Sequence, residues 1–162
     1  MVNVFQIFLM VNKPYRLPLL DYSRKYMSDE DYTLLMVDCW TMTEFPHQNG
    51  VRKMIKMWKK TDSQLLYSDE EEGDVEDKKD FDNLPDNFPI FRGIQTSKAV
   101  KRGLSWTTDI KVAKWFAKRW KKGKVYQARI NKKDVFYYTN QRNEKEVVIN
   151  PYTLKDFKEV SK

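Results

Sequence analysis

Cysteine and histidine are almost absent from this chain of 162 residues. Cys39 is the only cysteine, so no disulfide can form within the chain, and we expect a reducing, cytoplasmic setting. His47 is the only histidine, so the recurring cysteine and histidine spacing of a zinc site is missing as well. These shortages exclude disulfide-rich and zinc-stabilised scaffolds, and we expect a functional site without a metal.

Long apolar runs are also lacking. The apolar run at residues 4–10 is too short to span a bilayer. It has neither the basic flank nor the small-residue cleavage site of a signal peptide, and Asn12, Lys13 and Pro14 follow it. We therefore expect this segment to pack into the core, and we expect no membrane partner.

What the chain does contain is enough apolar material for one domain and an uneven charge. Hydrophobic residues make up 41% and aromatic residues 14% of the sequence. Residues 69–82 hold nine acidic residues and two lysines, a local charge of −7, so the remainder carries +14 within a net charge of +7. Such a basic excess attracts nucleic acid and other polyanions, although a lysine-rich solvated surface explains it equally well.

We expect a single α+β domain over residues 1–162. Residues 1–68 form a helical part, because apolar residues recur at helical spacing after a capping Ser28 and again after Gly50. The two stripes are Tyr32, Leu35, Met36, Cys39 and Trp40, then Val51, Met54, Ile55 and Trp58. Residues 69–87 are predicted to be an acidic exposed loop, because their apolar content is low and their like charge is high.

Residues 88–151 carry the remaining regular elements, and residues 152–162 form a C-terminal tail. A helix capped by Thr107, Thr108 or Asp109 is predicted to bury Ala113, Phe116, Ala117 and Trp120 and to end at a left-handed Gly123. After Gly123 the sequence pattern changes from helical spacing to a two-residue repeat, which predicts strands at residues 125–130, 135–138 and 144–149.

Polar groups lie at the ends of three of these elements. Arg92 and Gly93 follow an extended run, where a guanidinium can fork onto a phosphate or carboxylate and a glycine lets a ligand approach the backbone. Ser105 and Thr107 precede the helix, where capping and turn chemistry is the alternative explanation. A strand-end arginine is likewise often structural.

Two glutamates open the last predicted strand. Period-2 geometry places Glu144 and Glu146 on one face about 7 Å apart. A solvated edge strand can show the same pattern, but glutamate is a poor strand former, so the pair also indicates a functional site.

The ordered segments FRG, GLSWTTD and EKE resemble the arginine-serine-glutamate class of mono-ADP-ribosyltransferases. This class includes cholera-type and C3-type toxins and short phage or bacterial effectors. The resemblance covers roughly residues 88–151. It implies two small, roughly orthogonal β-sheets that clasp NAD, with N-terminal helices packed around them.

The resemblance also implies residue roles. Arg92 would anchor the dinucleotide, and Gly93 would read the nicotinamide amide through its backbone. Ser105, Trp106 and Thr107 would match a Ser-Thr-Ser segment at the cofactor, with Trp106 and Thr107 departing from it. Glu146 would be the catalytic glutamate, and Glu144 would face the acceptor.

The residue types suit this chemistry. Cleavage between nicotinamide and ribose passes through an oxocarbenium-like transition state, which the Glu146 carboxylate can stabilise. Ser105 can hold that carboxylate, Arg92 can fix the phosphates, and Glu144 can orient the nucleophile.

The acceptor is expected to be a protein, in particular an arginine side chain, with RNA or DNA as a close second. As a toxin or effector, such an enzyme can have an inhibitory antitoxin or immunity partner. The alternative is a noncatalytic basic module that binds nucleic acid through its lysines and stacks bases on Trp106, Trp115 or Tyr137.

Overall fold

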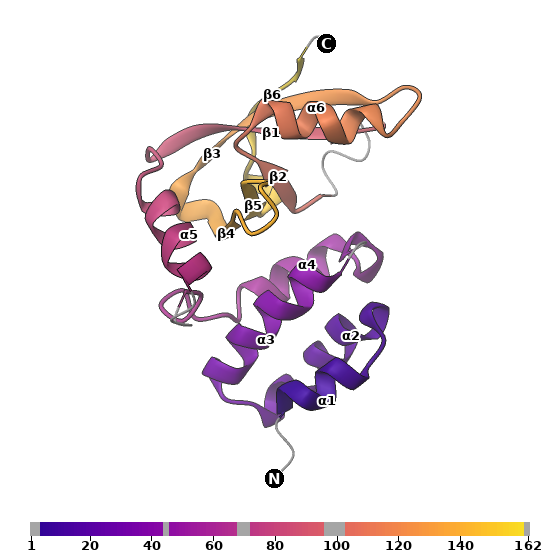
Figure 1. Cartoon of the computed structure of the whole chain (residues 1–162), viewed down its shortest axis with the longest axis vertical. Helices are drawn as coiled ribbons and strands as arrows, with labels where there is room; N and C mark the ends of the chain where they lie inside the picture. The colour runs from indigo at the N-terminus through magenta and orange to yellow at the C-terminus, as the bar shows by residue number, and fades with distance from the viewer. Residues whose placement is uncertain (1–3, 44–45, 68–71, 96–102, 161–162) are drawn as a thin grey trace. The chain divides into compact units, whose positions relative to one another are not determined.

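The computed structural model describes residues 4–43, 46–67, 72–95 and 103–160. The chain folds as two compact units, Met1–Ser68 and Asp69–Lys162. The first is helical, and the second combines two helices with a six-stranded antiparallel sheet, so the protein belongs to the α+β class as predicted (Figure 1). The prediction of one domain with its helices packed against the sheet stays a prediction.

Four α-helices build the first unit, with two short 3-10 turns between them. They are α1 (Val4–Met10), α2 (Lys13–Ser23), α3 (Asp29–Met42) and α4 (Val51–Trp58), and the turns are η1 (Arg24–Tyr26) and η2 (Pro46–Asn49). Ser28 caps α3 as predicted, because its hydroxyl accepts a hydrogen bond of 3.0 Å from the Asp31 N–H. All five residues of the predicted α3 stripe are buried.

The predicted α4 stripe is confirmed at Met54, Ile55 and Trp58, which are buried. The rings of Trp40 and Trp58 meet edge to face with centroids 5.5 Å apart, so α3 and α4 share one apolar core. The expectation for residues 4–10 needs correction. A helix of about two turns buries one side only, so Phe8 is buried while Met10 remains 86% exposed.

The predicted acidic loop is in fact largely helical, as α5 (Glu72–Asp82). Asp74, Asp77 and Phe81 lie at helical positions i, i+3 and i+7, and together they face β4 (Val135–Thr139). The Phe81 ring stacks on Tyr138 with centroids 6.2 Å apart, and Asp77 is buried. Tertiary contacts thus stabilise a helix whose own composition does not favour one.

All six strands join one sheet, in the order β4-β5-β2-β1-β3-β6, with antiparallel neighbours throughout. The other strands are β1 (Asn87–Ile94), β2 (Ser105–Thr107), β3 (Lys124–Asn131), β5 (Glu146–Ile149) and β6 (Lys155–Val160). The predicted strands at 125–130 and 135–138 are confirmed. The predicted tail instead contributes β6, which pairs with β3, and one sheet is present where the resemblance implied two.

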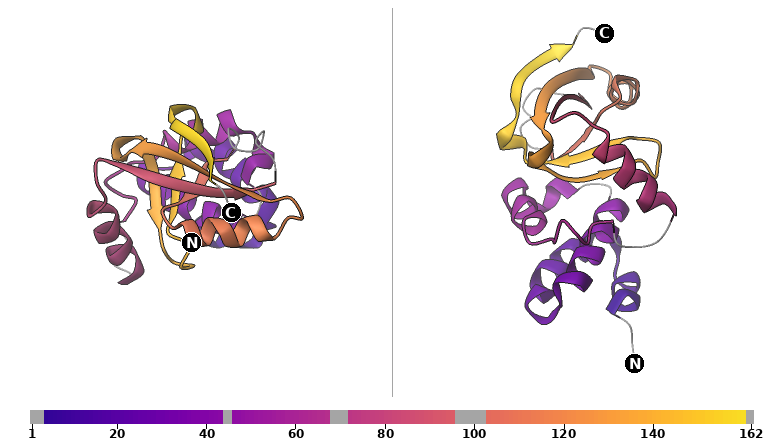
Figure 2. Two further views of the ribbon diagram at one scale, coloured as in Figure 1. Left: turned by 90° about the horizontal axis from the view of Figure 1, so that it is seen from above. Right: turned by 90° about the vertical axis from the view of Figure 1, so that its left-hand side faces the viewer.

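The sheet buries both of its faces. Alternate residues of β1 and β3, such as Ile90 and Ala128, belong to the larger core with Trp106 and Val147. The other face packs against α6 (Ile110–Lys118), which runs along β1 (Figures 1 and 2). These two cores hold the central strands from both sides, which fixes the positions of their side chains.

The α6 prediction is partly confirmed. Asp109 is the N-cap, since its carboxylate accepts from the Lys111 N–H at 2.8 Å, and Ala113 and Ala117 are buried. Trp120 lies beyond the end of the helix and is exposed rather than buried. Gly123 is not left-handed; a Cβ there would lie 1.8 Å from the Ala117 carbonyl oxygen, so close backbone approach explains this glycine.

Candidate functional site

Three neighbouring strands bring the predicted site segments together. Arg92 lies on β1, Ser105 and Thr107 lie on β2, and Glu146 is the first residue of β5. Strand β2 pairs with both of the others, with Thr107 opposite Phe91 on one side and opposite Glu146 on the other. Segments that are far apart in the sequence therefore lie on adjacent strands at the centre of the sheet.

The Arg92 guanidinium is held against the start of β2. Its Nη1 donates a hydrogen bond of 3.1 Å to the carbonyl oxygen of Ser105. Burial lowers the pKa of Arg92 to about 10, while the nearby Glu146 carboxylate acts in the opposite direction. Arg92 and Glu146 therefore interact electrostatically across β2.

Gly103 makes room for that guanidinium. A Cβ built on Gly103 would lie 1.1 Å from Arg92 Nη1 and 1.7 Å from its Cζ. No other residue type fits there unless Arg92 moves. Gly103 is not among the predicted site residues, and its position two residues before Ser105 is the only signal for it in the sequence.

The Trp106 side chain lies in the core rather than at a cofactor surface. It is 2% exposed, and its Nε1 donates to the Gly103 carbonyl oxygen at 3.0 Å. This bond fixes the same glycine that accommodates Arg92. The predicted contact between Trp106 and NAD therefore gives way to a packing role, which follows from the alternation of β2.

Thr107 joins three parts of the site. Its hydroxyl donates to the Glu144 carbonyl oxygen at 2.6 Å and accepts from the Asp109 N–H at 3.0 Å. In the β2–β5 register Thr107 lies directly opposite Glu146, whereas Ser105 lies opposite Val148. Ser105 is thus a diagonal neighbour of Glu146, about 7 to 8 Å away along the same face, and Thr107 is the closer partner.

Glu146 is a buried carboxylate, 7% exposed, at the start of β5. It lies between Thr107 of β2 and Thr139 of β4, its cross-strand partners on either side. Its negative charge also helps to raise the pKa of Tyr137, although burial of that phenol is the largest cause. A buried acidic group beside an arginine is the kind of arrangement that concentrates at functional sites.

The prediction that Glu144 and Glu146 lie on one face of the same strand is wrong. Strand β5 begins at Glu146, and Lys145 has a φ of +44°, so the chain is not extended between the two glutamates. Glu144 lies in the preceding loop and is more exposed than Glu146. That loop is fixed by hydrogen bonds from the Lys145 N–H to Asn140 Oδ1 (3.2 Å) and from the Thr108 N–H to the Lys145 carbonyl oxygen (3.2 Å).

Gly93 serves helix packing. A Cβ at this position would lie 2.0 Å from the Ala113 carbonyl oxygen and 2.5 Å from the Ala117 nitrogen of α6. The side of Gly93 on which a side chain would project is therefore covered by the helix. The ligand approach predicted from the glycine alone is replaced on that side by contact with α6.

Acidic residues of α5, which are not among the predicted site residues, reach the segment that follows β4. Asp77 Oδ1 accepts from the Asn140 N–H at 2.8 Å, and Asp74 Oδ1 accepts from Gln141 Nε2 at 3.3 Å. Both carboxylates contribute to the raised pKa of Tyr137. The i, i+3, i+7 spacing of Asp74, Asp77 and Phe81 was the signal available in the sequence.

The side chains that the alternative function requires are only partly accessible. Trp106 and Tyr137 are buried and cannot stack on bases, whereas Trp115 is 52% exposed. Within the described part of the chain, no group of three or more His, Cys, Asp or Glu side chains is placed to hold a metal ion. None of the helices described there combines the length and apolar composition needed to cross a bilayer.

No protein-family model matches this chain, and no curated protein or solved structure shows significant similarity to it.

Proposed function

We propose that this protein is a mono-ADP-ribosyltransferase that transfers ADP-ribose from NAD to a macromolecular acceptor. The observation that carries the proposal is the convergence of Arg92, Ser105 and Glu146 on three adjacent strands. Their sequence motifs suggested a common site before any spatial relation was known. The fold of this unit would then be of the ADP-ribosyltransferase type, with NAD as co-substrate.

Glu146 is the residue to which the bond-breaking step is assigned. Departure of nicotinamide leaves positive charge on the ribose, and a carboxylate beside it stabilises that charge. Burial of Glu146 supports this role, because electrostatic interactions are stronger where water is excluded. Thr107 and Thr139 flank the carboxylate from both neighbouring strands and restrict where it can lie.

Arg92 is assigned to the diphosphate of NAD. A guanidinium has five N–H donors in a planar fork, and one of them is used by the Ser105 carbonyl oxygen. That hydrogen bond and the close approach to Gly103 hold the Arg92 guanidinium in one place. Fixing the phosphates keeps the ribose from drifting away from Glu146, which contributes to catalysis through positioning.

Glu144 is assigned to the acceptor. It lies in the loop just before Glu146, and its backbone is tied to Thr107 of β2. A partly exposed carboxylate at this place can orient an incoming nucleophile or take its proton. The resemblance to short phage and bacterial effectors extends the proposal to a cytoplasmic toxin or effector with an inhibitory antitoxin or immunity partner.

The proposal is tested by incubating the purified full chain with NAD and measuring nicotinamide release by chromatography. Arg92→Lys keeps the charge and loses the fork, so it should raise the KM for NAD. Arg129→Lys is the matched control, because Arg129 is an arginine of the same sheet that bonds Asn87 instead. Absence of nicotinamide release, with NAD binding also undetectable by calorimetry, would overturn the proposed function.

A further inference from the structure

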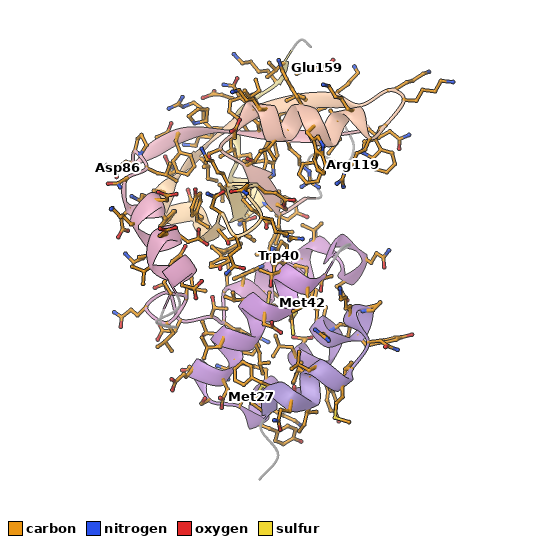
Figure 3. The ribbon with its side chains drawn as sticks, viewed as in Figure 1. Met27, Trp40, Met42, Asp86, Arg119 and Glu159 are labelled. Carbon is orange, nitrogen blue, oxygen red and sulfur yellow. The ribbon has the colours of Figure 1, made fainter. Side chains whose placement is uncertain are left out.

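The outer face of α6 and of the turn after it is strongly basic. We define the α6 face by its exposed residues, which are Lys111, Lys114, Trp115, Lys118, Arg119, Trp120, Lys121 and Lys122. Residues 110–123 contain no acidic residue. Figure 3 shows Arg119 at the end of α6, where this face continues into the turn.

The orientation of this face is fixed by packing. Ala113 and Ala117 lie against Gly93 of β1, so close that any side chain there would overlap the helix backbone. The helix cannot rotate without losing this contact. The lysines at i, i+3 and i+7, namely Lys111, Lys114 and Lys118, therefore share one surface.

Two large aromatic side chains are exposed on the same face. Trp115 is 52% and Trp120 is 49% exposed. The Arg119 guanidinium lies 3.9 Å from the centroid of the Trp115 ring, which orders both side chains through a cation–π contact. Exposed tryptophans leave apolar surface in water, and a ligand with flat rings would cover that surface.

Acidic groups near the face are few and engaged. The supporting strands β1, β2 and β3 contain no acidic residue. Asp109 caps the helix through the Lys111 N–H, and Glu159 of β6 pairs with Lys124 Nζ at 2.8 Å. The positive charge of the α6 face is therefore available to an external polyanion.

We propose that the α6 face binds single-stranded nucleic acid and, resting on the proposed function, that this nucleic acid is the acceptor of ADP-ribose. In that transfer the bond between ribose C1′ and nicotinamide breaks, nicotinamide leaves, and a nucleophilic atom of the nucleic acid forms the new bond to C1′ and gives its proton to Glu144. Cations beside exposed aromatic rings suit phosphates alternating with unpaired bases, since each base can stack on an indole. Lys111 to Lys118 spans about 10 Å along the helix, so these lysines can reach more than one phosphate of the bound nucleic acid. An acidic protein surface would use the lysines but would leave the two tryptophans without a role.

The α6 face also adjoins the candidate site. Helix α6 begins three residues after Thr107, and Asp109 bonds the Thr107 hydroxyl. Gly93, on which α6 packs, is the neighbour of Arg92. A nucleic acid bound along α6 is thus held beside the β-strands that carry Arg92, Ser105 and Glu146.

Docking is tested with the full chain and a fluorescently labelled twelve-nucleotide oligouridine, followed by anisotropy as salt is varied. Trp115→Ala should weaken binding at least fivefold through lost stacking. The pair Lys114→Ala with Lys118→Ala should reduce the slope of log K against log salt by about 1.4, or 0.7 for each phosphate contact.

The matched control is the pair Lys56→Ala with Lys59→Ala. These substitutions remove the same charge from Lys56 of α4 and from its C-cap residue Lys59. The only aromatic residue of this basic helix, Trp58, is buried. This variant should bind the oligonucleotide within twofold of the unchanged protein. The docking site would be overturned if both lysine-pair variants lost the same affinity for the oligonucleotide, or if Trp115→Ala left that affinity unchanged. It would also be overturned if polyglutamate bound more tightly than the oligonucleotide with the same dependence on Trp115.

The acceptor role has its own readout, which is transfer of labelled ADP-ribose from NAD to the oligonucleotide. Transfer that falls in parallel with anisotropy in Trp115→Ala supports it. Nicotinamide release by the unchanged protein without any transfer to bound oligonucleotide overturns the acceptor role and leaves the proposed function standing. Oligonucleotide binding without nicotinamide release would support the docking site and contradict the proposed enzymatic activity.

Discussion

Arg92 and Gly103 show how one glycine can determine the position of a charged group. Because the Gly103 Cα faces the guanidinium directly, a methyl group there would lie 1.1 Å from Nη1. The guanidinium is the far end of a flexible side chain, so it can move aside without disturbing the core. The position of the fork, rather than the stability of the fold, should therefore respond to a substitution at Gly103.

Gly103→Ala should lower kcat/KM for NAD at least tenfold while reducing the free energy of unfolding by less than about 2 kcal/mol. Nicotinamide release and urea unfolding measure the two effects. Gly50→Ala is the converse control. Gly50 has a φ of +83° with no atom near its missing side chain, so alanine there should cost about 1 to 3 kcal/mol of stability and leave turnover unchanged. An unaltered kcat/KM for NAD in Gly103→Ala would contradict the assignment of Arg92 to the NAD site.

Cys39 illustrates a buried group with a predictable pH dependence. Burial raises the pKa of this thiol to about 12, with a smaller contribution from Asp38. Between pH 9 and 12 the folded protein therefore keeps the thiol proton, whereas the unfolded chain, with a thiol pKa near 9, has lost it. The stability due to the neutral thiol is complete below pH 9 and is lost as the pH rises toward 12.

We expect the free energy of unfolding to fall by up to about 1.4 kcal/mol per pH unit above pH 9 on account of Cys39. Urea titrations at pH 8, 9 and 10 measure this fall, which should be smaller in Cys39→Ala. The native thiol should also be inert to Ellman's reagent at pH 8 and react once the chain is unfolded. Rapid reaction of the native protein would show that Cys39 is accessible.

At the scale of elements, α5 matters because it supports the loop before Glu146. Asp77 accepts from the Asn140 N–H, and Asn140 Oδ1 in turn accepts from the Lys145 N–H. The two bonds connect the helix to the residue that precedes the candidate catalytic glutamate. Lys145 has a positive φ, and these contacts help to hold it in that conformation.

Asp77→Ala removes the acceptor of a partly buried backbone N–H and should cost about 1 to 3 kcal/mol. Glu76→Ala, on the exposed side of the same helix, should change stability by less than about 0.5 kcal/mol. Chemical unfolding of both variants makes the comparison. Equal stability of the two proteins would mean that α5 does not support the loop through Asp77.

The elements that the sequence predicts well are those whose own residues determine them. Helices α3 and α4 and strands β3 and β4 follow from apolar spacing, and Ser28 and Asp109 are caps by their local chemistry. Helix α5 was missed because Asp74 and Asp77 occupy buried positions where apolar residues are expected. Hydrogen bonds from residues 140 and 141 make those positions favourable.

The site residues follow the same rule. The motif order predicted that Arg92, Ser105 and Glu146 belong to one site, and the sheet order brings their strands side by side. The relation of Glu144 to Glu146 was not predictable from alternation, because a single positive φ at Lys145 ends the strand. The roles of Gly93 and Gly103 depend on what lies opposite them, which a single sequence does not reveal.

At the scale of the whole molecule, the residues assigned to NAD all lie in the Asp69–Lys162 unit. This unit has two apolar cores of its own, one on each face of its sheet. Helix α6, which carries the basic face, packs on the sheet that contains Arg92 and Glu146. The proposed enzyme therefore has its cofactor-binding and acceptor-binding elements within one compact unit.

The most direct test of this proposal is nicotinamide release from NAD by Glu146→Gln. The substitution keeps the shape of the side chain and removes the charge that would stabilise the oxocarbenium-like transition state. We expect turnover to fall by a factor on the order of a hundred to a thousand while NAD binding persists. Glu144→Gln is the control, for which nicotinamide release should largely survive and transfer to the acceptor should fall. Near-normal turnover in Glu146→Gln would contradict the proposed mechanism.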